Sequence, residues 1–319
     1  METLKDKYAS YFKIGSAFEN HDLVKADLIK THFNSMTCAN AMKYGSLTRN
    51  PGEYNFDRAD SLVAFAKENN MAIHGHTLVW HNQTPDYIFE NATAESLLET
   101  LRMHTRLVRE HFGDLETFDA LNEAIEDKSD EFLRDTKWLR TIGEDYIAKI
   151  FRVIKEEMPN TELFYNDYND CFPEKRAKIV RLLKNLLADG VPVDGMGMQF
   201  HINLYEPSMD EVKRSIEEYA ALGLKLRISE LDVSVYHAGK EDPQLTMTPE
   251  IIKAQADIYG ELFKIFRSYA QHIEAVTFLG VADSDSWLNY FPVPGRRNFP
   301  LLFDDNGQPK EAFYRVMDF

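Results

Sequence analysis

The chain has 319 residues, 44% of them hydrophobic, and its 52 Asp and Glu residues against 36 Lys and Arg give a formal net charge of −16 at pH 7. Such an acidic surface repels nucleic acid and anionic membranes, so we expect neither as a partner. The only cysteines, Cys38 and Cys171, cannot build a disulfide framework or a cysteine-rich metal site.

The N-terminal segment METLKDKYASYFK carries several charges and lacks the apolar core of a secretory signal peptide. No run of 18 apolar residues, the length needed to cross a bilayer, occurs in the sequence. We therefore expect a cytoplasmic protein.

Short apolar segments alternate with longer amphipathic ones along the whole chain. The longer segments, with apolar residues three and four positions apart, predict helices over 94–111, 138–158 and 173–188. The last of these opens with Pro173 and closes at Asp189-Gly190, the residue types that favour a helix start and stop. The short segments predict strands near 11–17, 33–37, 71–78, 116–122, 161–165, 195–201, 225–230 and 275–280.

This alternation favours the α/β class and a single (β/α)8 barrel that covers residues 1–319. A doubly wound sheet would be expected to carry a glycine-rich phosphate loop, and the sequence has no G-x-G-x-x-G or Walker motif. In a barrel, the chemistry lies at the carboxyl ends of the strands.

Two glutamates stand at such strand ends. Glu123 follows Asn122 after the predicted fourth strand, and Glu230 ends the seventh, two residues before Asp232. Two facing carboxylates can cleave a glycosidic bond, one as a proton donor and the other as nucleophile or base. Glu123 would then need a raised pKa, whereas Glu230 must stay ionised, with His201 as the expected donor and Asp232 orienting that imidazole. The plainer interpretation is that each glutamate merely begins a solvated loop.

Several blocks in fixed order resemble glycoside hydrolase family 10, from near Lys13 to the C-terminus. They include GHTLVWH at 75–81, NEA at 122–124, YNDYN at 165–169, GMQ at 197–199 with His201, SELD at 229–232, 283–287 and PLLFD at 300–304. The resemblance implies a retaining endo-1,4-β-xylanase that acts on xylan-derived oligosaccharides and needs no metal or organic cofactor.

By position, the resemblance assigns Glu123 as acid/base and Glu230 as nucleophile. It makes Asn122 the residue that hydrogen-bonds the 2-hydroxyl of the sugar being cleaved, with His201 and Asp232 supporting the nucleophile. Gln199 and Tyr168 are implied to line the same site. On the glycone side, substrate-binding positions are implied at Asn40, Lys43, His76, Trp80, Gln83 and Trp287.

Two positions depart from the family pattern. Ala39 stands where the family usually has a Glu that hydrogen-bonds the sugar one step beyond the cleavage point. Leu279 stands where it usually has a Trp that covers the sugar at the cleavage site. Both departures remove contacts on the glycone side, so an alternative is a related retaining β-glycosidase with altered glycone specificity.

Two further hypotheses come from other features. His74 and His76, an HxH pair on the predicted third strand, suggest a metal-dependent barrel hydrolase with His201 and Asp283 as further ligands. This hypothesis leaves both glutamates without a role. A non-catalytic carbohydrate binder could use Trp80, Tyr168 and Trp287 as sugar platforms, but it gains nothing from the glutamate pair.

Overall fold

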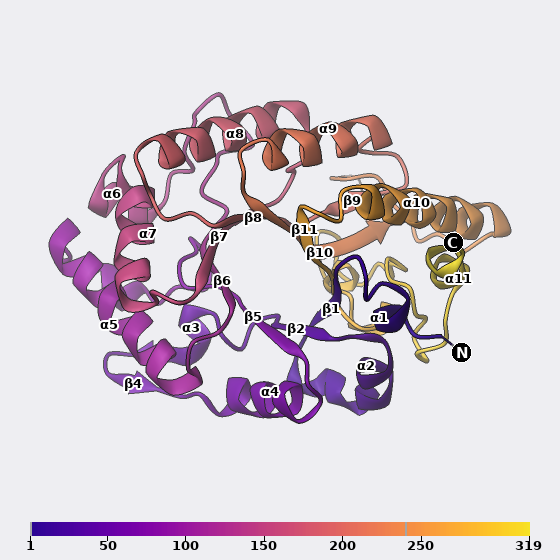
Figure 1. Cartoon of the computed structure of the whole chain (residues 1–319), viewed down its shortest axis with the longest axis horizontal. Coiled ribbons are helices and arrows are strands. Elements are labelled where there is room, and N and C mark those ends of the chain that lie inside the picture. The colour runs from indigo at the N-terminus through magenta and orange to yellow at the C-terminus, as the bar shows by residue number, and fades with distance from the viewer. Residues whose placement is uncertain (1, 240) are drawn as a thin grey trace.

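A computed structural model describes residues 2–239 and 241–319 of the chain. Parallel strands close into a barrel surrounded by a ring of helices (Figure 1), which confirms the predicted single-domain (β/α)8 fold. The barrel strands are β1 (Lys13–Phe18), β2 (Ser35–Cys38), β5 (Ala72–Gly75), β6 (Thr117–Asn122), β7 (Glu162–Asp167), β8 (Gly195–Met198), β10 (Lys225–Ser234) and β11 (Ile273–Leu279). Each pairs in parallel with its neighbours in this order, and β11 pairs with β1 and β10 to close the ring.

Three shorter strands lie outside this ring. β9 (His201–Asn203) pairs in parallel with the carboxyl half of β10, and β3 (Thr48–Asn50) forms a hairpin with β4 (Glu53–Tyr54). Both additions are near the carboxyl ends of barrel strands, because β9 follows β8 and the hairpin follows β2.

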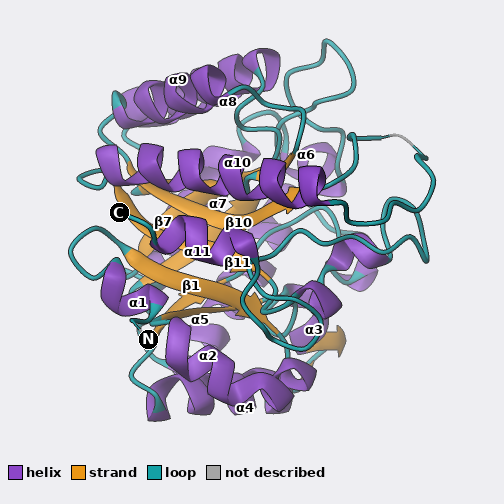
Figure 2. Cartoon of the chain, turned by 90° about the vertical axis from the view of Figure 1, so that its right-hand side faces the viewer, coloured by secondary structure: helices purple, strands orange, loops and turns teal. Residues whose placement is uncertain are grey.

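Helices cover the outside of the barrel (Figure 2). The α-helices are α1 (Leu4–Lys7), α2 (Ala26–His32), α3 (Tyr44–Leu47), α4 (Asp57–Glu68), α5 (Ala94–Phe112), α6 (Lys137–Ile142), α7 (Tyr146–Glu157), α8 (Pro173–Ala188), α9 (Met209–Ala220), α10 (Pro249–Ser268) and α11 (Glu311–Met317). The 3-10 helices are η1 (Asn20–Lys25), η2 (Asp86–Phe89), η3 (Asp283–Asp285) and η4 (Trp287–Asn289). Within the described ranges, no helix combines the length and apolar character that crossing a membrane requires.

The predicted helices agree with this arrangement except in one place. α5 and α8 begin at the predicted residues, with Thr93 accepting a hydrogen bond from the backbone of Ser96 as N-cap of α5. The single helix predicted over 138–158 is wrong, because the segment forms two helices. Gly143 follows α6 with φ +103°, a conformation that ends the helix, and α7 starts three residues later.

Candidate active site

The two candidate carboxylates lie at irregular stretches of strand pairing. The register between β6 and β7 shifts between Asp119 and Leu121, just before Asn122 and Glu123. The register between β10 and β11 shifts between Ile228 and Leu231, on either side of Glu230. Such irregularities bend a strand and re-aim its side chains, and they occur often beside active sites. Glu123 also has φ +57°, which is strained for a residue other than glycine.

Glu123 receives hydrogen bonds at both carboxylate oxygens. The indole of Trp80 donates to Oε2 over 2.8 Å, and the amide of Gln199 donates to Oε1 over 3.1 Å. The amide of Asn122 also approaches Oε1 at 3.3 Å. The backbone of Glu123 is fixed as well, because its N–H donates to the carbonyl of Asn166 over 2.8 Å.

Glu230 lies beside a histidine–aspartate pair. His201 Nε2 is 3.3 Å from Glu230 Oε2, and its Nδ1 is 2.9 Å from Asp232 Oδ2. The indole of Trp287 donates to the same Asp232 oxygen over 2.8 Å. At its other oxygen, Glu230 accepts a 2.9 Å hydrogen bond from the amide of Asn166.

Asn166 joins the two carboxylate environments, and the sequence reasoning gave it no role. The same amide nitrogen that donates to Glu230 is 2.9 Å from Asn122 Oδ1, and Asn122 contacts Glu123 in turn. The Asn166 oxygen accepts from Ser229 Oγ over 2.7 Å. Gly197 makes room for this side chain, because a Cβ at that position would lie 2.3 Å from Asn166 Oδ1. Its position directly after the strand predicted over 161–165 marked Asn166 as a candidate site residue, although the sequence does not show its bonding partners.

The two carboxyl groups have opposite pKa shifts. For Glu123, burial raises the pKa, and the hydrogen bonds from Gln199 and Trp80 only partly oppose this; the charges of Asp167 and Glu230 raise it further. For Glu230, burial also opposes ionisation, but the hydrogen bond from His201 and the charges of His76 and His201 lower the pKa to about 2. One carboxyl is thus set to hold a proton and the other to remain ionised.

His201 is held as a cation in this arrangement. Burial lowers its pKa, but the carboxylates of Asp232 and Glu230 outweigh that effect, so the pKa lies well above its ordinary value. An imidazolium between two carboxylates stabilises both negative charges.

The histidine pair of the metal hypothesis contacts an aspartate instead. His76 Nδ1 is 2.8 Å from Asp119 Oδ2, and His74 Nε2 is 3.1 Å from Asp119 Oδ1. Burial, followed by the charge of Arg227, lowers the pKa of His74 to about 4. Across residues 2–239 and 241–319, no group of three or more His, Cys, Asp or Glu side chains is placed to hold a metal ion.

Most of the predicted glycone-side residues lie together. Lys43 Nζ donates to Asn40 Oδ1 over 3.0 Å and lies 4.7 Å from the ring centroid of Trp80. The amide of Gln83 reaches the same Asn40 oxygen at 3.4 Å. Burial lowers the pKa of Lys43, while Glu230 and Glu123 oppose this, so the amine lies within reach of their charges.

Tyr168 is connected to the site through an arginine. Its hydroxyl accepts a 2.7 Å hydrogen bond from Arg134, whose Nε donates to the backbone carbonyl of Glu123 over 3.0 Å. The Arg134 side chain comes from the long segment after β6, where strand and helix periodicity give no information on position. Sequence reasoning therefore missed it.

The two departures from the family pattern lie at the ends of β2 and β11. Ala39 and Leu279 are both half-buried. Next to Ala39, the backbone N–H of Asn40 donates to the carboxylate of Glu19, and Glu19 also accepts a 2.7 Å hydrogen bond from Arg58. A carboxylate that directly follows β1 thus already bonds the residue next to Ala39.

The profile of Glycosyl hydrolase family 10 matches residues 3–319 of the chain. The chain is 44% identical to endo-1,4-β-xylanase B of Paenibacillus barcinonensis, with 99% of this chain and 97% of that protein covered. It is 42% identical to endo-1,4-β-xylanase A of Caldicellulosiruptor saccharolyticus, with 99% and 96% covered.

Solved structures give the same result. An endo-1,4-β-xylanase from Caldicellulosiruptor owensensis superimposes with a TM-score of 0.97 at 43% identity, and 100% of each chain is covered. A glutamate-to-alanine mutant in complex with xylotriose superimposes with a TM-score of 0.97 at 42% identity, again with 100% of each chain covered.

Proposed function

The chain belongs to glycosyl hydrolase family 10 and hydrolyses xylan and xylo-oligosaccharides as a retaining endo-1,4-β-xylanase; on this premise we propose that Glu230 is its nucleophile and Glu123 its acid/base. The supporting observation is the asymmetry of their surroundings. Glu230 faces the His201–Asp232 pair, whereas Glu123 accepts only from neutral amide and indole donors. The xylanase activity replaces the metal-dependent hydrolase and the non-catalytic binder as hypotheses.

In the first step, Glu230 attacks the anomeric carbon while Glu123 gives its proton to the departing glycosidic oxygen. The C–O bond to the leaving sugar breaks, and an ester bond forms between Glu230 and the glycone. The donors on Glu230 keep it ionised before attack, and the raised pKa of Glu123 keeps its proton available.

In the second step, water releases the glycone from Glu230. The ester removes the negative charge of Glu230, one of the charges that raise the pKa of Glu123, so Glu123 becomes more acidic. The leaving group has taken the proton of Glu123, which now accepts a proton from the attacking water. Hydrolysis of the ester returns both carboxyl groups to their starting states.

The remaining predicted residues support these two. We assign Asn122 to the 2-hydroxyl of the sugar being cleaved, and His201 with Asp232 to the orientation and charge of Glu230. Gln199 positions the Glu123 carboxylate by donating to it, and Tyr168 is linked to Glu123 through Arg134. Substrate binding on the glycone side falls to Asn40, Lys43, His76, Trp80, Gln83 and Trp287.

The assignment can be tested by substituting each glutamate and measuring the hydrolysis of aryl xylosides that have good leaving groups. Glu230→Gln should abolish turnover because no nucleophile remains. Glu123→Ala should still form the glycosyl-enzyme, since a good leaving group needs little protonation, and the intermediate should accumulate. Added azide should then restore turnover by attacking the intermediate without a base. Equal loss of the first step in both variants would show that the roles are wrongly assigned.

We also propose a cytoplasmic location and short xylo-oligosaccharides as the preferred substrates. Cys38 and Cys171 are both buried and free, a state that a reducing compartment preserves. The binding of xylotriose by a solved relative supports short chains as ligands. Cell fractionation tests the location, and finding the native protein mainly in the supernatant of intact cells would contradict it.

A further inference from the structure

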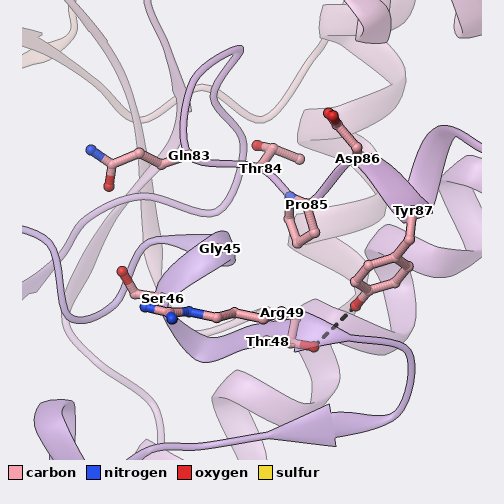
Figure 3. A pocket seen from close by; sticks show the side chains of 9 residues that line it. All are labelled: Gly45, Ser46, Thr48, Arg49, Gln83, Thr84, Pro85, Asp86 and Tyr87. Carbon is pink, nitrogen blue, oxygen red and sulfur yellow. Dashed lines mark hydrogen bonds between the residues drawn. The ribbon is translucent and has the colours of Figure 1, made fainter.

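A cavity of about 500 Å³ adjoins the glycone-side residues at Gln83 (Figure 3). Its walls come from the segments that follow β2 and β5. Its volume lies within the range of sites that bind small molecules. The lining residues are Gly45, Ser46, Thr48, Arg49, Gln83, Thr84, Pro85, Asp86 and Tyr87.

The wall that the cavity shares with the glycone-side residues is held by close backbone packing. The N–H of Gly45 donates to the carbonyl of Gln83 over 2.7 Å. A Cβ at Gly45 would lie 2.6 Å from that carbonyl oxygen, so only glycine permits this approach. Gln83 itself has φ +48°. The cavity is therefore built onto the end of the glycone region by a defined contact between two loops.

Arg49 supplies a positive charge that nothing in the cavity neutralises. Its exposed side chain runs along the wall toward Ser46 (Figure 3), and its guanidinium has no acidic partner anywhere in the described part of the chain. The only acid that lines the cavity, Asp86, already pairs with Lys137 at 2.6 Å. Glu53, across the β3–β4 hairpin, accepts from Asn50 over 2.8 Å.

Two neutral donors complete the lining. The Ser46 hydroxyl bonds no other side chain or backbone group among residues 2–239 and 241–319, and the Gln83 amide makes only its 3.4 Å contact with Asn40. The other hydroxyls are engaged, because Thr84 donates to the carbonyl of Trp80 over 2.6 Å and the Thr48 and Tyr87 hydroxyls lie 3.0 Å apart. The donors left available are a guanidinium, a hydroxyl and an amide.

We propose that this cavity binds an acidic side group of the substrate, namely a uronic acid carried by a xylosyl unit on the glycone side of the cleaved bond. Arg49 pairs with its carboxylate, and Ser46 and Gln83 bond its hydroxyl groups. A guanidinium fork matches a carboxylate in shape and charge, whereas a neutral xylose chain offers it no counter-charge. This inference rests on the proposed glycone side, since Gln83 places the cavity there.

Three oligosaccharides with the same xylose backbone test the inference. One is linear, one carries a glucuronic acid near its non-reducing end, and one carries the same group with its carboxyl reduced to an alcohol. For Arg49→Gln, the ratio of kcat/KM for the acid to that for its reduced form should fall about fivefold, as for loss of an exposed ion pair. Arg49→Lys should keep part of the preference. Lys213→Gln, which removes a charge on α9, is the matched control and should leave the ratio unchanged.

The outcomes separate this inference from the proposed function. An unchanged ratio in Arg49→Gln, or an equal loss with the acid and its reduced form, would overturn the charged site. If the ratio fell equally in Lys213→Gln, the preference for the acid would come from the net charge of the protein and not from Arg49. Failure of the wild-type enzyme to cleave the linear oligosaccharide would instead contradict the proposed function. High salt should weaken the preference of the wild type for the acid, because an exposed ion pair is screened.

Discussion

Glu123 and Glu230 each accept hydrogen bonds from at least two side chains, whereas the glycone rim, defined here as Ala39, Arg49 and Leu279, makes few polar contacts. At the rim, Ala39 and Leu279 stand where the family resemblance led us to expect a glutamate and a tryptophan, and Arg49 has no acidic partner in the described ranges. Preorganised donors act on charge that develops in the transition state. Substitutions in the catalytic centre, meaning the side chains that bond Glu123 and Glu230, should therefore lower kcat. Substitutions at the glycone rim should instead alter which sugar binds.

Apart from the two glutamates themselves, the largest effect is expected at Asn166, which bonds both Glu230 and Asn122. Asn166→Ala removes the donor to Glu230 and the link to Asn122, so kcat should fall about 100-fold or more with KM little changed. Gly197→Ala should lower kcat too, because its Cβ would push against Asn166 Oδ1. Steady-state kinetics on xylo-oligosaccharides checks both variants, with thermal unfolding to verify the fold.

The matched control is Asn160→Ala, which removes an exposed asparagine that bonds Asp114 over 2.9 Å. It should leave kcat and KM unchanged. If Asn166→Ala raised KM and spared kcat, Asn166 would be a substrate-binding residue rather than part of the catalytic network.

The pH dependence of kcat/KM should separate the two carboxyl groups. Glu230 must be ionised, so activity falls as the pH drops through its pKa, which is about 2. Glu123 must be protonated, so activity falls as the pH rises through its pKa, which lies above the ordinary value for glutamate. His201→Asn removes the donor to Glu230 and should move the acidic limb upward by about one pH unit.

Gln199→Leu is the complementary change. Gln199 donates to Glu123 and lowers its pKa, so the variant should move the basic limb upward and leave the acidic limb in place. A shift of the same limb in both variants would show that the two carboxyl groups are not tuned independently.

Much of the catalytic centre could be predicted because the apolar segments located β6 and β10. Glu123 directly follows β6 as predicted, whereas β10 does not end at Glu230 but continues to Ser234, where its last residues pair with β9. The bridge by Asn166 could not be predicted, since it depends on space left by Gly197 on a neighbouring strand. Likewise, the amphipathic pattern runs on past Gly143, and only its backbone conformation shows that two helices form there.

At the glycone rim, a substitution should raise activity on a neutral substrate, whereas the substitutions in the catalytic centre lower it. Leu279→Trp restores an aromatic surface over the sugar at the cleavage site, and stacking on one ring is worth on the order of 1–3 kcal/mol. For a weakened xylose subsite, kcat/KM on linear xylo-oligosaccharides should rise roughly tenfold for each 1.4 kcal/mol recovered. For a site widened to admit a larger or decorated sugar, Leu279→Trp should instead reduce activity on that sugar and change linear substrates little. Kinetics on both substrate types checks this, and no change on either would mean that the position is neutral.

Ala39→Glu should have the smallest effect. A regained hydrogen bond to a sugar hydroxyl contributes about 0.5–1.5 kcal/mol, which is a gain of roughly tenfold at most. The local charges work against even this gain, because Glu19 already accepts from the backbone of Asn40 and would repel a second carboxylate beside it. Combining Ala39→Glu with Glu19→Gln removes that repulsion, so the double variant should gain more on linear xylo-oligosaccharides than the sum of the two single changes. If the double variant shows only additive changes in kcat/KM, the carboxylates at 19 and 39 do not repel each other, and the small effect of Ala39→Glu has another cause.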